Sequence, residues 1–439
     1  TPAPEESSPV TVFEYTETQT DTFGYRIPSI LTTSDGTLLA FAEKRVGLHD
    51  HAQNDIVLRR SFDNGLSWEA EQMIAEDGKN SLNGDFISFT TANQSKLQPY
   101  LDLAEDSTTA ETDFAYLGIN EATRANNLIN YIRGDDSAPA DTNLRNRTLG
   151  PKVYKLGDIV HSTPTPVGRP VDNYDLIYKD ETYKEFYLLH KDRETVVYTG
   201  ANDGMLHAFL AGVFEPGEKL TGHGAQFTVD AAKYGSLQAG DEIWAYIPQN
   251  LLPHLKWLAD PAYLDGTHVY YVDLKPRIFD ARIYEGAGDS NHPLHDLWTS
   301  GMNDPERDLR PYGWCTVLVG GMRFGGGTIN VNAAWSDGDT SKTFTSSYFA
   351  MDVTDPKNPI LLWERNYPGL GFTSSFPAVL KVEKRNIITG TPDTVNVLER
   401  HWYLLFGSGP TTYDGISAQS SSIFLVDMAS GRTDLAGYN

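Results

Sequence analysis

The sequence predicts a mostly β protein whose larger part, residues 151–439, is an incomplete β-propeller. The first observation is the segment 196–209, in which two apolar, β-forming runs flank Asn202, Asp203 and Gly204, residues suited to a tight turn. The second is repetition, because an apolar strand, a glycine-rich turn and a second strand with an acidic turn return at 316–364 and 402–432. Short antiparallel strands with turns at regular spacing are typical of propeller blades.

The composition excludes several classes of partner. The formal net charge of −24 over 439 residues argues against nucleic acid and anionic membranes, since both attract cationic surfaces. No apolar run reaches the 18 residues of a membrane span. Cys315 is the single cysteine, which rules out an intrachain disulfide and a thiolate metal cluster, and its apolar surroundings predict a buried side chain. Residues 1–10 are expected to be a disordered Pro/Ser/Glu tract.

Residues 11–83 carry motifs that differ from the rest of the chain. They are the sequence YRIP at 25–28, AFAEKR followed by DHAQNDIVLRR within 40–60, and SFDNGLSW at 61–68, an Asp box. At this spacing the segment resembles the first blade of the sialidases (neuraminidases). The resemblance implies that Arg26 and Arg45 line a pocket for the sialic acid carboxylate and that Asp50 is the general acid/base. These residue types suit that chemistry, because guanidinium groups bind carboxylates and an oxocarbenium-like transition state needs a proton donor.

A structural interpretation stands beside this one. Asp boxes are turn motifs, so Asp63 is expected to bond its own turn and Trp68 to pack between strands. For the two arginines and Asp50, the alternative is ordinary surface charge. The family's later blades supply two more arginines, a glutamate and a nucleophilic tyrosine, and residues 84–439 contain no recognisable counterparts. We therefore expect a non-enzymatic protein, with exo-α-sialidase as the one enzymatic alternative that a motif supports.

Residues 84–150 are predicted to be a linker that contains one helix at 120–133. Ala125, Leu128, Ile129 and Ile132 recur at helical spacing, Asn120 is suited to cap the start, and a glycine follows the end. The composition changes sharply after residue 83, which is compatible with a natural fusion, an assembly artefact or an engineered chimera.

The larger part of the chain also resembles a known family. Its matching segments are LGDIVHSTP, VVYTGANDGMLHAF, WAYIPQNLLPHL, YYVDLKP, WCTVLVGGMRFGGG, MDVTDPKNPILLWE and LGFTSSFP, in this order between residues 156 and 377. They resemble the C-terminal β-propeller of PilY-type proteins, which are tip-associated adhesins and assembly factors of type IV pili. Trp244 and Trp363 fall in equivalent places of two repeats, and we expect both to pack between adjacent blades.

The resemblance makes calcium the one cofactor to consider, but no residues of this sequence form a matching site. The family's acidic calcium loop has no match here, and the sequence stops at GRTDLAGYN, before the blades expected to carry that loop. Asp158, His161 and His207 suggest a metal or acid–base site, but the histidines adjoin apolar strands without a second ligand at coordinating spacing. Packed, hydrogen-bonded histidines are the favoured interpretation.

The sequence therefore predicts a secreted or bacterial cell-surface protein, associated with type IV pili, that acts in adhesion or in pilus assembly and retraction. Its expected partners are pilus components or a host-surface ligand, with sialylated glycans as a further possibility. The alternatives are a sialidase or sialic-acid-binding module in residues 11–83 and a quinoprotein-like dehydrogenase, whose blades share the strand–turn–strand–Trp pattern.

Overall fold

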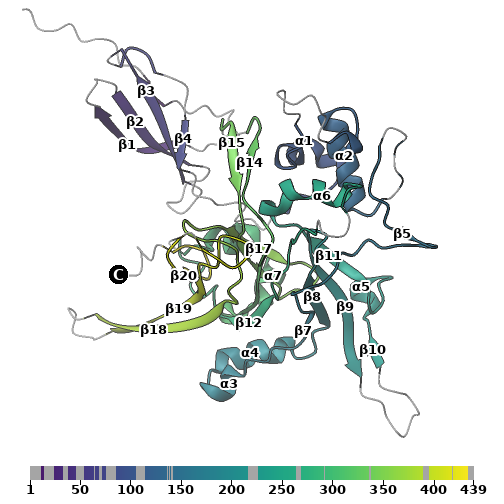
Figure 1. The fold of residues 1–439 in the computed structure, drawn as a ribbon. Helices are drawn as coiled ribbons and strands as arrows, with labels where there is room; N and C mark the ends of the chain where they lie inside the picture. The colour runs from purple at the N-terminus through teal and green to yellow at the C-terminus, as the bar shows by residue number, and fades with distance from the viewer. Residues whose placement is uncertain are drawn as a thin grey trace, which may run out of the picture.

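The structure, a computed structural model shown in Figure 1, is mostly antiparallel β with short helices. The described residues are 11–13, 24–32, 38–45, 54–63, 65–68, 72–75, 86–104, 114–135, 137, 139, 142–215, 226–263, 268–290, 292–335, 338–388, 395–417 and 419–433. The tract 1–10 lies outside them. None of the described helices has the length and apolar character needed to cross a membrane.

The N-terminal motifs form an antiparallel sheet of their own. Its strands, in spatial order, are β1 (Gly24–Thr32), β2 (Leu38–Arg45), β3 (Asn54–Ser61) and β4 (Gln72–Ala75). The register of β1 against β2 shifts between Arg26 and Ser29, at the position of Pro28, which has no backbone N–H to donate. In Figure 1 this purple sheet lies to one side of the other sheets.

The first blade contains the strand–turn–strand unit predicted at 196–209. Its strands are β7 (Thr165–Val167), β8 (Thr195–Gly200), β9 (Leu206–Glu215) and β11 (Glu242–Tyr246), and β10 (Gln226–Thr228) extends the far end of β9. β8 and β9 are antiparallel neighbours, which confirms the hairpin. Gly204 has a φ of +101° in the turn, a conformation that L-residues with a side chain rarely adopt.

The second and third blades correspond to the two later repeats. The second contains β12 (Arg277–Ala281), β13 (Cys315–Gly321), β16 (Tyr348–Asp352) and β17 (Ile360–Arg365) in that spatial order. The third contains β18 (Ala378–Ile388), β19 (Val395–Gly407) and β20 (Ile423–Asp427). Two small hairpins lie outside the blades, β5 (Thr148–Leu149) with β6 (Lys152–Val153) and β14 (Ile329–Asn332) with β15 (Ser341–Phe344).

The second blade is buried on both faces. Leu318 and Met351 are opposite one another in β13 and β16, and both join the core shared with the first blade. The next pair along the ladder, Val319 and Ala350, joins the core shared with the third blade. Because successive side chains of a strand point to opposite faces, a blade between two others needs apolar residues at successive positions of its central strands and not only at alternate ones. This explains the unbroken apolar runs of the sequence and the burial of Cys315.

The two tryptophans join successive blades in the same way. The indole N–H of Trp244, on β11, donates to the carbonyl of Pro356 in the turn that follows β16 (2.8 Å). The indole N–H of Trp363, on β17, donates to the carbonyl of Met428 in the turn that follows β20 (2.9 Å). The predicted equivalence of Trp244 and Trp363 is therefore confirmed, and each fixes the outer strand of its blade to the next blade.

A carboxylate strengthens the contact between the first two blades. Glu364, on β17, accepts hydrogen bonds from the hydroxyl of Tyr246 (2.9 Å) and the backbone N–H groups of Gln249 (2.7 Å) and Asn250 (2.9 Å). It also accepts from the side-chain amide of Asn250 and the hydroxyl of Ser347. Both oxygens are thus satisfied by donors from the end of β11, the 3₁₀ turn Gln249–His254 and the start of β16.

The described helices cover the blades. They are α1 (Gln94–Leu97), α2 (Glu121–Ile132), α3 (Tyr174–Ile177), α4 (Glu181–His190), α5 (Ala231–Tyr234), α6 (Lys256–Ala259) and α7 (Asp304–Asp308). The predicted helix at 120–133 is α2, and the Asn120 side chain caps it by accepting from the Thr123 N–H (2.9 Å). Leu128 and Ile129 share a core with Leu258 of α6 and Val196 of β8, and α2 contacts α6 directly, so this segment and the first blade belong to one hydrophobic core.

Candidate functional site

The structure places two of the three sialidase-like positions on adjacent strands. Arg26 pairs with Glu43 and Arg45 pairs with Gly24 in the ladder between β1 and β2, so the two backbones are diagonal neighbours. Asp50 lies outside the described residues. The assignment of these three residues to a sialic acid site therefore stays a prediction.

The Asp box is a hydrogen-bonded turn, as predicted. One oxygen of Asp63 accepts from the Ser61 hydroxyl (2.8 Å) and the Ser67 N–H (2.9 Å), and the other accepts from the Ser67 hydroxyl. The Ser61 hydroxyl in turn accepts from the N–H of Gly65, whose φ is +88°. The bonds from Ser67, followed by that from Ser61, lower the pKa of Asp63 to about 2. This carboxylate holds the turn and is not a group that exchanges protons near neutral pH.

The predicted histidines are packed and hydrogen-bonded. The imidazole Nδ1 of His161 lies 2.5 Å from one carboxylate oxygen of Asp273. The other oxygen of Asp273 accepts a hydrogen bond from the backbone N–H of His161. His207, on β9, is almost fully buried between Asp203 of the β8–β9 turn and Glu242 of β11. Within the described ranges, no three His, Cys, Asp or Glu side chains are grouped to hold a metal ion.

His207 carries a positive charge at neutral pH. Burial disfavours the imidazolium, but the hydrogen bonds that the ring donates to Asp203 and Glu242, together with the negative charges of these carboxylates, outweigh burial and raise the pKa of His207 to about 9. The imidazolium therefore offsets the charge of Asp203, which lies at the edge of a cavity. At the same edge, Asp158 pairs with the imidazole of His268 at 2.9 Å.

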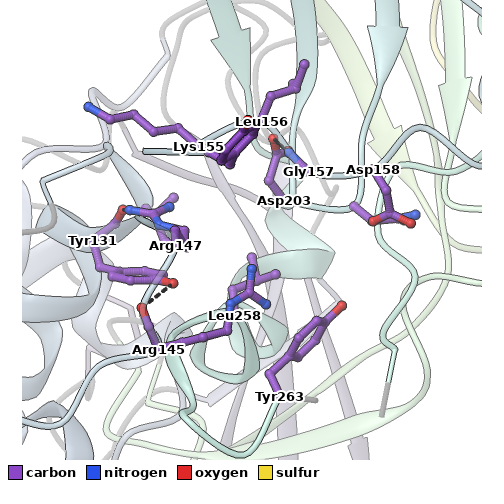
Figure 2. A pocket seen from close by; sticks show the side chains of 13 residues that line it. Tyr131, Arg145, Arg147, Lys155, Leu156, Gly157, Asp158, Asp203, Leu258 and Tyr263 are labelled. Carbon is purple, nitrogen blue, oxygen red and sulfur yellow. Dashed lines mark hydrogen bonds between the residues drawn. The ribbon is translucent and has the colours of Figure 1, made fainter. Parts of the chain in front are cut away.

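The cavity lies where α2, α6 and the β8–β9 turn meet the extended segment that leads into the first blade (Figure 2). Its volume is about 190 Å³. The residues that line it include three cations and three tyrosines: Arg145, Arg147, Lys155, Tyr131, Tyr154 and Tyr263. In a chain with a net charge of −24, this is a notable concentration of positive charge.

Each arginine of the cavity stacks on a tyrosine ring. The Arg145 guanidinium lies 4.5 Å from the ring centre of Tyr263, and the Arg147 guanidinium lies 3.8 Å from that of Tyr131. Arg147 also donates to the Tyr131 carbonyl (2.8 Å), and the Tyr131 hydroxyl donates to the Arg145 carbonyl (3.2 Å). These contacts restrict the positions of both guanidinium groups.

One wall of the cavity depends on a glycine. The Gly157 N–H donates to the Asp203 carboxylate at 2.7 Å, and a Cβ on Gly157 would lie 2.4 Å from the Asp203 backbone nitrogen. A side chain at this position would therefore push the segment away from the β8–β9 turn. Sequence reasoning did not find this cavity, although the alternating arginines of RNR at 145–147 in an acidic chain are the signal that could have indicated it.

Comparison with known proteins identifies relatives of the larger part of the chain. Residues 156–294 match the model of the PilY1 beta-propeller domain. The chain is 29% identical over 276 residues to the type IV pilus biogenesis factor PilY1 of Pseudomonas aeruginosa strain PAK, which covers 61% of this chain and 17% of that protein. A PilY1 homolog of Xylella fastidiosa is 28% identical over 312 residues, or 69% of this chain and 18% of its own length. The chain thus spans less than a fifth of these relatives.

Shorter matches connect part of the chain to sialidases. A sialidase of Paraclostridium sordellii is 28% identical over 159 residues, which covers 29% of this chain and 39% of that enzyme. Sialidase-2 of Rattus norvegicus is 39% identical over 72 residues, or 15% of this chain and 19% of the enzyme. Both resemblances expected from the motifs are therefore present, and the PilY1 match covers more of the chain.

Proposed function

From the match of residues 156–294 to the PilY1 beta-propeller domain, we propose that this chain is part of a surface protein of the type IV pilus apparatus. Its role is binding, in adhesion or in the control of pilus assembly and retraction, and its partners are pilus components or a host-surface ligand. The match is the observation that carries the proposal. The blade-to-blade contacts of Trp244, Trp363 and Glu364 support it, because they build a rigid array of blades whose faces can bind partners.

Co-sedimentation with type IV pili tests this function. The purified chain is mixed with pili sheared from P. aeruginosa and centrifuged, with flagellar filaments as the control polymer. We expect the chain to sediment with pili and not with flagella. A folded chain that stays in the supernatant with pili contradicts the proposal, and circular dichroism establishes that the chain is folded. If the chain sediments equally with both filaments, the association is unspecific and the proposal also fails.

We propose a sialic-acid-directed role for residues 11–83 as a second candidate function. The sialidase matches and the hydrogen-bonded Asp box favour it. In this role Arg26 binds the carboxylate of a sialylated glycan, Arg45 lines the same pocket, and Asp50 is the general acid/base for the glycosidic oxygen. Without the later arginines, the glutamate and the tyrosine nucleophile, such a site binds its ligand but leaves the reaction without its covalent step.

We therefore expect no turnover of a fluorogenic sialoside by the purified chain, and measurable binding of sialic acid that Arg26→Ala weakens. The assay monitors fluorophore release, and Asp50→Asn and Arg26→Ala are the matched variants. Turnover by the parent chain that is lost in both variants would show that the chain completes a sialidase site. If sialic acid binds equally well to the parent chain and to the Arg26→Ala variant, the proposal that the N-terminal sheet binds sialic acid through Arg26 is wrong.

A further inference from the structure

We propose that the cavity between α2, α6 and the β8–β9 turn binds the oxyanion of a small organic acid through Arg145 and Arg147. The oxyanion is a carboxylate or a phosphate monoester, since both match the planar donor edge of a guanidinium group. The apolar part of the ligand lies against Tyr154 and Leu156 at the cavity mouth. This inference concerns residues 131–263 and is independent of the proposed pilus function.

The orientation of the arginines is the first argument. Arg145 and Arg147 are both half-buried and lie over the rings of Tyr263 and Tyr131, so their rotamers are restricted before a ligand arrives. A guanidinium group carries its N–H donors in a planar fork that matches the oxygens of a carboxylate or a phosphate. Tyr131 is itself 2% exposed and anchored by α2, which makes this platform rigid.

The local charge is the second argument. Of the two carboxylates at the cavity, Asp203 is bonded to His207 and to the Gly157 N–H, and Asp158 is paired with His268. Both of these carboxylates therefore have hydrogen-bonding partners outside the pair of arginines. The overall charge of −24 repels anions at long range, so anion binding by this chain requires a site of short, directed contacts.

Lys155 belongs to the wall of the cavity rather than to its centre. Its side chain passes over Gly134 at the end of α2, and its charge acts on the Asp135 carboxylate. Figure 2 shows its ammonium group pointing outward, away from the two arginines. The arginines are therefore the cations that a ligand inside the cavity meets.

The volume of the cavity and the apolar side chains at its mouth define the class of ligand. A volume of about 190 Å³ is below the range of roughly 300–1,000 Å³ for drug-sized ligands, which limits the occupant to a small acid. Tyr154 is 56% exposed and Leu156 is 48% exposed, which leaves an apolar surface beside the charged interior. A ligand that combines an oxyanion with an apolar group would use both.

Titration of the full chain with four probes tests the proposal. The probes are acetate, benzoate, inorganic phosphate and phenyl phosphate, added at constant ionic strength with chloride as the balancing ion, and binding is followed by calorimetry or NMR. We expect benzoate to bind more tightly than acetate, or phenyl phosphate more tightly than phosphate, and the tighter pair identifies the oxyanion. If none of the four binds more tightly than chloride, the proposal is overturned.

Matched variants locate the binding. Arg145→Gln is expected to weaken the preferred probe about tenfold, because a charged hydrogen bond is lost. Lys191→Gln removes the same charge from an exposed position just beyond α4, far from the residues that line the cavity, and is expected to leave affinity unchanged. Arg145→Lys keeps the charge without the planar fork and should bind with intermediate affinity. Equal affinities for Arg145→Gln and Lys191→Gln would overturn the proposal, and circular dichroism confirms that each variant is folded.

Discussion

Replacement of Arg310 by methionine is expected to lower the free energy of unfolding by about 3–5 kcal/mol, because it leaves a buried carboxylate without its cation. Arg310 and Asp352 are 1% and 0% exposed, and the Arg310 Nε lies 2.6 Å from an Asp352 oxygen. Asp352 also accepts from the Tyr284 hydroxyl (2.9 Å) and the Thr354 N–H (2.9 Å). These two bonds remain in the variant, but they do not supply the lost positive charge.

The loss of stability in the Arg310→Met variant depends on pH, and the pKa of Asp352 determines the direction of this dependence. Burial raises the pKa of this carboxyl, but the charge and hydrogen bond of Arg310 outweigh burial and lower it. A carboxyl whose folded pKa is depressed contributes stability above its unfolded pKa near 4, and this stability is lost as pH falls through the folded pKa. In the Arg310→Met variant Asp352 can become neutral by protonation, so the difference between parent and variant should shrink from pH 7.5 to pH 4.5.

Urea unfolding at these two pH values measures both effects. The double variant Arg310→Met/Asp352→Leu serves as the control, because it removes both charges and should recover much of the stability. A single-variant cost below about 1 kcal/mol, the magnitude of an exposed pair, would contradict the buried ion pair. A cost that does not change with pH would contradict the role given to the Asp352 charge.

Substitution of Trp363 by alanine is expected to destabilise the chain by about 3–5 kcal/mol, the usual cost of removing a large buried aromatic side chain. Trp363 is 4% exposed, and a Cβ on Gly431 would lie only 2.6 Å from its ring, so the indole fits closely against the third blade. The alanine variant loses this packing and also the hydrogen bond to the Met428 carbonyl.

Trp363→Phe separates the two contributions. Phenylalanine keeps most of the packing but cannot donate to Met428, so we expect a smaller loss, with about 1 kcal/mol from the hydrogen bond. Trp244→Ala should also cost less than Trp363→Ala, because Trp244 is only half-buried. Unfolding of the three variants in urea gives the order of their stabilities. If Trp363→Ala unfolds at the same urea concentration as the parent, the blades are not held together through this side chain.

The sequence predicted the parts of the fold that depend on local pattern. Alternation between two cores makes most positions of β13 and β16 apolar, and the tight turn at Gly204 needs a residue tolerant of positive φ, so both features are visible in the sequence. The equivalence of Trp244 and Trp363 was visible for the same reason, since each follows an acidic turn at a fixed point of its repeat. The Asp box was predicted from residues at most six positions apart.

Features that depend on distant contacts were not visible. Nothing near α2 in the sequence shows that Leu128 shares a core with Leu258 and Val196, which lie many residues away, so residues 84–150 were predicted to be a linker. The cavity was missed because Arg145 stacks on Tyr263 and its wall depends on Gly157 bonding to Asp203. Each of these pairs is brought together only by the packing of the helical segment on the first blade.

The Glu364 contact has a mechanical consequence. Four residues of the first two blades donate to this one carboxylate, and the Trp244 indole crosses the same boundary in the same direction, from the first blade to the second. A force that separates the two blades would have to break these neighbouring bonds together, because they all cross the same boundary. If the proposed pilus function holds, the outer strands of the two blades would separate as one unit under tension and not one at a time.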